Sequence, residues 1–305
     1  MAPGFSEPFV DAHHHFWDLG RNPYPWLQGE EVANFRYGDY SRLKRDYLPG
    51  DFERDTAGCA PARTVHVEAE WSRATPVDET RWLTALATAC GRPSAIVAHA
   101  SLGREDAAEV LAAQAAHALV RGIRNKPAAS AGPGDARRGR SGSMDDPQWR
   151  RGYALLQDHG LSFDLQAPWW DLDQACALAR DFPATLLILN HTGLPADRSE
   201  AGLHGWRRAL EQLAALPNTA IKISGLGQPG RPWTQADNVP LMRDAIAIFG
   251  AQRCMFASNF PVDSLVADYP TILAGFAAAI ADRTDAERRA LLHDNAVRIY
   301  RIATL

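Results

Sequence analysis

The sequence lacks the features of membrane, disulfide-stabilised and nucleic-acid-binding proteins. No apolar run in the 305 residues is long enough to cross a bilayer, and no basic stretch followed by an apolar core indicates a secretory leader. The four cysteines are dispersed without C-x-x-C spacing, which is typical of reduced core residues. A formal net charge of −4 offers no basic field to nucleic acid or an anionic membrane. We therefore expect a soluble cytoplasmic protein with a small-molecule partner.

Glycine motifs for nucleotides are also missing, since no G-x-G-x-x-G or P-loop follows an early strand-like segment. This absence disfavours a doubly wound open sheet. Eight short apolar segments, from "PFVDAHH" to "RCMFASNF", instead alternate with Ala/Leu-rich amphipathic ones. Eight such units over about 250 residues match a closed (β/α)8 TIM barrel. We expect residues 1–305 to form one α/β domain of this fold, with long loops at 19–50 and 126–148, the second mobile over the site.

Three adjacent histidines follow the first apolar segment, in "DAHHHFWD" at 11–18. A strand sends alternate side chains to opposite faces, so Asp11, His13 and His15 are predicted to share one face and His14 to face the other. Two imidazoles on one face can converge on one metal ion or one substrate oxygen. The apolar context "PFVDAHHHFW" argues against a purification tag.

Other polar side chains are expected at the open end of the barrel, where the carboxyl ends of the strands line the active site. The alternation in "TVHVEAEW" predicts that the polar residues His66, Glu68 and Glu70 point inward. The same reasoning places Arg124, His191, Lys222, Ser224 and Asn259 on inner faces or at strand ends. Buried polar groups need partners, so several of these must meet each other, a ligand or water.

The motifs that carry these residues occur in one order along nearly the whole chain. They are "VDAHHHFWD", "GIRN", "LNHTGLP", "IKISGLG", "MFASNFPVD" and the terminal "DNAVRIY". The ordered set resembles the amidohydrolase superfamily, specifically its amidohydrolase-2 branch of metal-dependent-hydrolase-like TIM barrels. This branch includes sugar-acid, dicarboxylate and muconolactone lactonases. The resemblance implies a barrel hydrolase.

Two positions depart from the family pattern. The eighth strand of this superfamily usually ends in an aspartate that binds metal or deprotonates water, whereas this chain has Asn259. Asn190 precedes His191 where related lactonases often have Asp-His. The fourth strand offers no inward lysine that could bridge two metal ions, which argues against a binuclear centre. A site with one metal ion or none remains.

Both of these alternatives stay open on the sequence. The donors His13, His15 and His191, with Glu70 or Glu68, form an N3O set suited to one Zn²⁺ ion. Without metal, the same groups would form a hydrogen-bonded network around substrate carboxylates. The histidines would then polarise the scissile carbonyl and stabilise the oxyanion.

Water activation needs a base other than Asn259, because an amide cannot accept the proton. Glu70 is the preferred candidate, since burial can raise a carboxyl pKa towards neutrality. Asp263 is the alternative, and it can equally cap the following helix. Asn259 then becomes a positioning residue.

Arg124 is predicted to anchor an anionic substrate group through its planar fork, or else to form a salt bridge with Glu68 or Asp164. Lys222 is either a second anion contact or an ion-pair partner in the barrel. Trp17 belongs to a group of loop aromatics that suit a ring-shaped substrate.

These features together favour a hydrolase that opens the lactone of a small carboxylated or sugar acid. The resemblance also allows a non-oxidative decarboxylase. A third alternative is an inactive barrel that binds a small acid, although a dead site has no need of three inward imidazoles. The sequence leaves a homo-oligomer open.

Overall fold

The computed structural model describes residues 8–29, 32, 35–135 and 139–303. Over these ranges eight strands form one sheet in chain order, each parallel to its neighbour. The strands are β1 (Val10–His14), β2 (Arg63–Val67), β3 (Ala95–His99), β4 (Val120–Arg124), β5 (Ser162–Leu165), β6 (Leu187–Leu189), β7 (Thr219–Ile223) and β8 (Cys254–Phe256). The predicted (β/α)8 architecture is confirmed.

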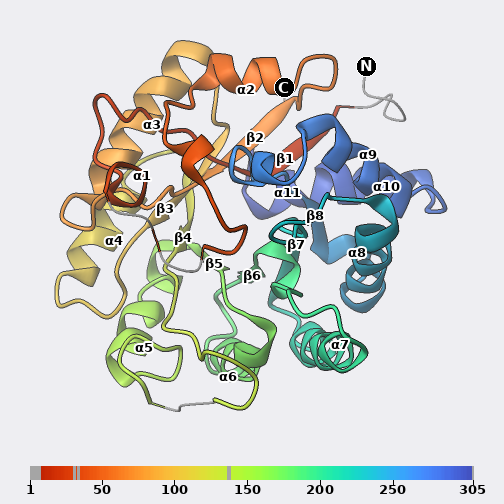
Figure 1. Ribbon diagram of the computed structural model, residues 1–305. Coiled ribbons are helices and arrows are strands. Elements are labelled where there is room, and N and C mark those ends of the chain that lie inside the picture. The colour runs from red at the N-terminus through yellow and green to blue at the C-terminus, as the bar shows by residue number, and fades with distance from the viewer. Residues whose placement is uncertain (1–7, 30–31, 33–34, 136–138, 304–305) are drawn as a thin grey trace.

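Helices surround the strands, as Figure 1 shows in a view along the barrel. The segment between β1 and β2 carries α1 (Pro25–Gln28) and α2 (Pro49–Asp55). The next helices are α3 (Pro76–Cys90), α4 (Ala107–Ala115), α5 (Pro147–Ala154), α6 (Leu172–Asp181), α7 (Glu200–Ala214), α8 (Gln235–Phe249), α9 (Tyr269–Ala279), α10 (Asp285–Arg289) and α11 (Asn295–Ile299). Across the described ranges, none of the helices combines the length and apolar character that a membrane span requires.

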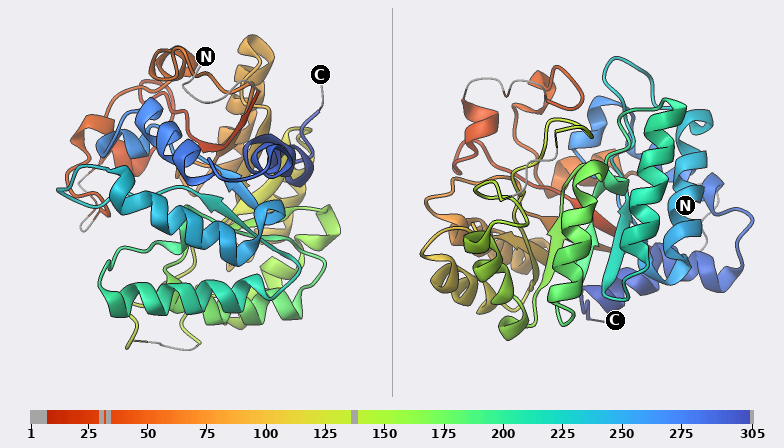
Figure 2. Two further views of the ribbon diagram at one scale, coloured as in Figure 1. Left: turned by 90° about the vertical axis from the view of Figure 1, so that its right-hand side faces the viewer. Right: turned by 90° about the horizontal axis from the view of Figure 1, so that it is seen from below.

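The two ends of the barrel differ in whether other parts of the chain cover them. Ala296 and Ile299 of α11, with Tyr300 beyond it, pack against lumen residues such as Val10 and Val65. In Figure 2 the C-terminus lies at the opposite end of the molecule from the red-orange segment between β1 and β2. The N-terminal ends of the strands are therefore closed by the end of the chain, which leaves the carboxyl ends available for a site.

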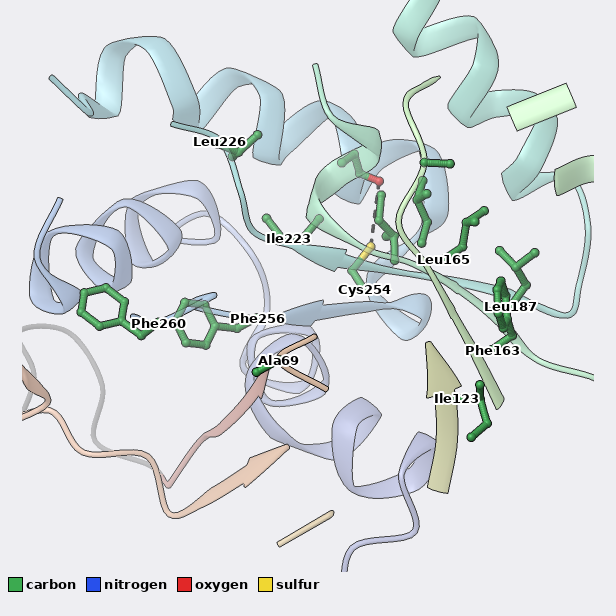
Figure 3. Packing of buried hydrophobic residues seen from close by; sticks show 14 of the residues in the cluster. Ala69, Ile123, Phe163, Leu165, Leu187, Ile223, Leu226, Cys254, Phe256 and Phe260 are labelled. Atoms are coloured by element: carbon green, nitrogen blue, oxygen red, sulfur yellow. Dashed lines mark hydrogen bonds between the residues drawn. The ribbon is translucent and has the colours of Figure 1, made fainter. Parts of the chain in front are cut away.

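The interior of the barrel is mainly apolar, and a second apolar layer lies between strands and helices. Apolar side chains fill the lumen, including Val65, Val67, Ile188, Met255 and Ala257. Figure 3 shows part of the outer layer, including Ile223, Phe256 and Phe260. The predicted inward direction of Lys222 agrees with this layering, because its neighbours Ile221 and Ile223 belong to the outer layer.

The predicted inward face of β2 is wrong. Val65 and Val67 fill the lumen, whereas His66 lies against Phe16 and accepts a hydrogen bond from the Phe16 amide at 2.9 Å. The apolar residues point inward because the narrow lumen is packed like a core. Beyond the strand the backbone leaves the alternation, and Glu70 has a φ of 61°.

The predicted common face of Asp11, His13 and His15 is wrong for Asp11. The register of β1 against β2 shifts between Asp11 and His14, which is a β-bulge or similar irregularity. Such an irregularity re-aims the side chains that follow it. Ala12 therefore faces the lumen, while Asp11 accepts a hydrogen bond from the Tyr269 hydroxyl of α9.

The long-loop expectations fit the described residues in part. The segment 19–50 contains α1 and the start of α2, whereas no helix or strand interrupts the described part of 126–146. Residues 30–31, 33–34 and 136–138 lie outside the described residues. Mobility of the second loop stays a prediction.

His14 faces away from the barrel mouth, as predicted. Its ring packs against Phe16, Phe52 and His66, and neither ring nitrogen has a hydrogen-bond partner among the described residues. Burial is the main cause that lowers the pKa of His14 well below its usual value. The folded protein therefore holds His14 neutral, whereas the unfolded chain binds a proton below about pH 6.5. The free energy of unfolding therefore decreases as the pH falls below about 6.5, because only the unfolded chain then binds this proton.

We predict that His14→Phe raises the free energy of unfolding by about 1 kcal/mol at pH 7, because it keeps a ring and removes two unpaired polar atoms. The difference in free energy of unfolding between this variant and wild type should be larger at pH 5, since phenylalanine cannot titrate. Urea denaturation at the two pH values measures both effects. His204→Phe, on the exposed face of α7, is the matched control and should not be stabilised. A variant less stable than wild type at both pH values would contradict the prediction.

Candidate active site

A cavity of about 240 Å³ opens at the carboxyl ends of the strands. Residues that follow five different strands line it, together with residues from the long segment after β1. They are His15, Trp26, Val32, Phe35, Arg36, Ala69, Glu70, Arg124, Lys126, Gln166, His191, Asn259 and Val262. This is the end at which barrel enzymes build their active sites.

His15 lies at the centre of a group of polar atoms from β1 and the end of β8. Its Nδ1 lies 2.7 Å from the Val67 carbonyl oxygen, so Nδ1 carries the proton and donates it. The Nε2 atom of the neutral ring is then an acceptor. Nε2 lies 3.3 Å from His13 Nε2 and 3.3 Å from Asn259 Oδ1.

Asn259 is held in one orientation by Asp263. The Asn259 Nδ2 group donates to Asp263 Oδ1 at 2.5 Å, which turns the amide oxygen towards His15. Asp263 also accepts hydrogen bonds from the Tyr37 hydroxyl at 2.9 Å and from Arg36 Nη2 at 3.2 Å. Burial raises the pKa of Asp263, and Arg36 and these hydrogen bonds oppose that shift.

Asp263 does not line the cavity, so the structure places it behind Asn259 rather than beside a substrate. It also does not cap α9, because Asp268 fills that role by accepting from the Thr271 amide. The alternative that Asp263 caps this helix is therefore wrong.

His191 reaches the cavity from an unexpected direction. Leu187 and Leu189 lie in the outer layer, and strand alternation would place His191 with them. The backbone at His191 has a φ of 54°, and this left-handed turn accompanies the change of direction. Its Nδ1 lies 3.0 Å from the Ser224 hydroxyl oxygen.

The three site histidines are neutral at pH 7. Burial is the largest cause that lowers the pKa of His13, His15 and His191 well below the usual value, and nearby cations add to it. Neutral rings leave lone pairs for accepting protons or hydrogen bonds.

Arg124 forms the salt bridge with Glu68 that the sequence left open as an alternative. Its Nε donates to Glu68 Oε1 at 2.8 Å, and its Nη2 donates to the Glu68 carbonyl oxygen. Only Nη1 remains towards the cavity, 3.5 Å from His13 Nε2 and 3.4 Å from Gln166 Oε1. Burial alone would raise the pKa of Glu68, but Arg124 and Arg73 hold it well below the usual value. Arg124 therefore cannot bind a substrate carboxylate in bidentate fashion, because Glu68 already engages two of its three nitrogens.

Glu70 is the sole carboxylate among the described lining residues. Its side chain is 34% exposed, and it is paired with Lys126 Nζ and, at 3.6 Å, with Arg73 Nη2. Glu68, the other candidate on this segment, is fully buried beneath Arg124 and does not line the cavity.

Two predicted substrate contacts lie away from the cavity. Lys222 is fully buried in the barrel, where Nζ lies 2.6 Å from Asp164 Oδ1, which is the ion-pair alternative. Trp17 is buried behind Trp26, with its indole nitrogen donating to the Arg45 carbonyl at 2.6 Å. Neither placement agrees with direct substrate contact.

Three polar lining residues, Arg36, Lys126 and Gln166, were not predicted from the sequence. Gln166 follows β5 at the same parity as the inward residue Asp164, so strand alternation in "LSFDLQ" would have found it. Arg36 lies in an irregular segment, where no periodicity predicts its direction.

The predicted zinc set is not assembled. The 3.3 Å between His13 Nε2 and His15 Nε2 equals the separation of roughly 3.3 Å expected for two nitrogens on a tetrahedral zinc ion. Within the described ranges, however, no group of three His, Cys, Asp or Glu side chains is placed to hold a metal ion. The third atom near His15 is a neutral amide oxygen, and the Arg124 guanidinium lies 3.5 Å from His13 Nε2. Among the described residues, the two histidines thus lack a third His, Cys, Asp or Glu ligand, and the guanidinium cation beside them opposes a divalent ion.

Comparison with known proteins gives the site a context. The amidohydrolase family model matches residues 10–302. A protein of Sinorhizobium fredii designated y4mH is 38% identical over 96% of this chain and 98% of its own length. The L-fucono-1,5-lactonase of Burkholderia multivorans is 31% identical over 95% of each chain.

A solved structure has the same architecture. An amidohydrolase from Burkholderia multivorans, crystallised with bound HEPES and with bound zinc, superimposes with a TM-score of 0.80 at 30% identity. The alignment covers 97% of this chain and 100% of that one. The bound zinc is a property of that protein.

We predict that chelation leaves the turnover of this protein unchanged within about twofold, because its histidine and amide donors do not form a metal set. Protein purified without a tag is incubated with a chelator, and its activity and metal content are then measured. Loss of activity that returns on addition of Zn²⁺ would contradict the prediction.

Proposed function

The chain belongs to the amidohydrolase family, and from this premise we propose that it is a lactonase. It opens the cyclic ester of a small carboxylated or sugar acid by attack of water. One observation carries the proposal: a single cavity combines the acceptor pair His15 Nε2 and Asn259 Oδ1, 3.3 Å apart, with several cationic side chains. The identity to an L-fucono-1,5-lactonase supports a sugar-acid lactone as the substrate.

The lining favours an anionic or strongly polar ring. Arg36, Arg124 and Lys126 contribute three positive charges, against the single negative charge of Glu70. Trp26 and Phe35 form an apolar wall, with stacked rings whose centroids lie 6.0 Å apart. A cavity with one aromatic wall and a few polar groups is typical of sites for small cyclic ligands.

The attacking water is oriented by His15 and Asn259. Both present acceptor atoms, so a water bound to this pair donates one hydrogen to it. The other hydrogen is then left for Glu70, and a lone pair of the water oxygen can point at the lactone carbonyl carbon. This role replaces the expectation that His15 polarises the substrate carbonyl, because its only N–H group is engaged by Val67. Asp263 acts as a positioning residue through Asn259.

The developing oxyanion faces the cationic side of the cavity. Arg124 Nη1 and Lys126 are the charged donors there, and donors fixed before reaction stabilise such charge effectively. The ion pair with Glu68 holds the Arg124 guanidinium in place. Pairing with Glu68 therefore contributes to the site although it occupies two of the three guanidinium nitrogens.

Glu70 is the general base of the proposed reaction. It takes one proton from water as the water oxygen bonds to the lactone carbonyl carbon. The tetrahedral intermediate then collapses with cleavage of the ring C–O bond, and the proton on Glu70 passes to the departing alkoxide. The product is the open hydroxy acid, which releases a proton at neutral pH.

The experiment that tests the function is a proton-release assay on a panel of lactones that includes L-fucono-1,5-lactone. We expect at least one sugar-acid or carboxylated lactone to be opened well above its uncatalysed rate. Carbon dioxide release from an aromatic carboxylic acid without any lactone turnover would instead support a decarboxylase. Tight binding of the acid without turnover of either class would support an inactive barrel.

We predict that Glu70→Gln lowers kcat by about 10²–10⁴ while KM changes little, since it removes the base and keeps the shape of the side chain. Steady-state kinetics on the best lactone of the panel measures both constants. Glu109→Gln, on the exposed face of α4, is the matched control and should behave as wild type.

The rival base gives the opposite result. If Asp263 takes the proton, Glu70→Gln retains activity whereas Asp263→Asn abolishes it in a folded protein. That pair of results would refute the role of Glu70.

A further inference from the structure

A second cavity lies at the same end of the barrel, on the other side of Arg36. Its volume is about 330 Å³, and residues after β4, β5, β6 and β7 form its walls. The lining consists of Arg36, Ala129, Ser130, Pro168, Trp170, Leu194, Pro195, Ala196, Gly225, Gly227, Gln228 and Pro229. The proposed reaction uses none of this space.

The wall between the two cavities is thin. Arg36 lines both of them, while His191 lines the first and Gly225 lines the second. A Cβ atom built on Gly225 would lie 2.6 Å from the His191 Cβ and 3.0 Å from Arg36 Nη1. Gly225 thus lets the backbone lie directly against His191, with a φ of 67° that also favours glycine. Arg36 is the residue common to both linings, so a ligand that extends from one cavity into the other would lie beside it.

The second cavity has a mainly apolar lining. Arg36 is the single charged side chain among the described residues that line it. The Trp170 indole N–H donates to the Ser130 carbonyl at 2.9 Å, so its polar atom is already used and its ring offers an apolar surface. Proline, leucine and alanine side chains form most of the remaining wall, and Ser130 and Gln228 are its uncharged polar residues. A cavity of roughly 150 Å³ already accommodates benzene, so this space is large enough for an aromatic ring.

Arg36 could bind a ligand that occupies both cavities at the atom that joins its two parts. Its Nη2 donates to Asp263, whereas Nη1 is buried and has no hydrogen-bond partner among the described residues. An unpaired buried donor costs free energy. An oxygen atom in the link between a lactone ring and its substituent would supply the missing acceptor after a small shift of the guanidinium.

We propose that the second cavity is a subsite for an aromatic or alkyl substituent of the substrate, joined through an oxygen to the lactone ring. The inference rests on the proposed lactonase function and extends it. The first cavity takes the polar ring that reacts, and the second takes the apolar group that Arg36 separates from it. The substrate class is then a hydrophobically substituted sugar-acid lactone.

The test compares a hexono-1,5-lactone with its mono-O-benzyl ethers, one for each hydroxyl. We expect at least one ether to have a kcat/KM at least about tenfold above the parent lactone, because burial of the benzyl group is favourable. Ala196→Trp and Ala129→Trp fill the cavity from two different walls, and both residues are exposed. Each variant should abolish the advantage of the ether and leave the parent lactone unchanged.

Ala108→Trp, on the exposed face of α4, is the matched control and should keep the preference. Opening of the parent lactone without a preference for any ether would overturn the subsite and leave the proposed function intact. A preference that survives both cavity-filling variants would also overturn it. Failure to open any lactone would refute the proposed function and the subsite with it.

Discussion

The site depends on the seam where the first strand meets the last. The Asp11 carboxylate of β1 accepts hydrogen bonds from the Ser258 amide at 2.9 Å and the Ser258 hydroxyl at 2.5 Å, just beyond β8. Two main-chain bonds continue the seam, from the Asn259 amide to the His13 carbonyl and from the His15 amide to the Phe260 carbonyl, both at 2.7 Å. Burial raises the pKa of Asp11 to about 6, although its hydrogen bonds oppose this shift. Closing the barrel is thus what brings His13 and His15 beside Asn259.

Three cavity residues also share an unusual backbone. Glu70, His191 and Asn259 follow β2, β6 and β8, with φ values of 61°, 54° and 58°. Residues other than glycine rarely adopt this region, at a cost of about 1–3 kcal/mol each. The rest of the fold tolerates the strain. At Glu70 and His191 the left-handed turn accompanies a side-chain direction towards the cavity that strand alternation alone would not give.

These features explain which parts of the molecule the sequence could predict. The eight alternating units and the ordered motifs were enough to predict the barrel. They were also enough to predict that His15, His191 and Asn259 lie at one site. The inward face of β2 was predicted wrongly, because alternation carries no information on whether apolar or polar residues fill a lumen. Arg36 was missed since its loop has no periodicity. The pairing of Arg124 with Glu68 was an open alternative that only the coordinates could resolve.

The central claim is that water attacks a lactone carbonyl at this seam. Turnover of L-fucono-1,5-lactone or the best lactone of a panel in H2¹⁸O, followed by mass spectrometry, tests it most directly. The account predicts one ¹⁸O atom in the carboxylate of the hydroxy acid, formed far faster than without the enzyme. Label appearing no faster than in the enzyme-free reaction, for every lactone tried, would contradict it.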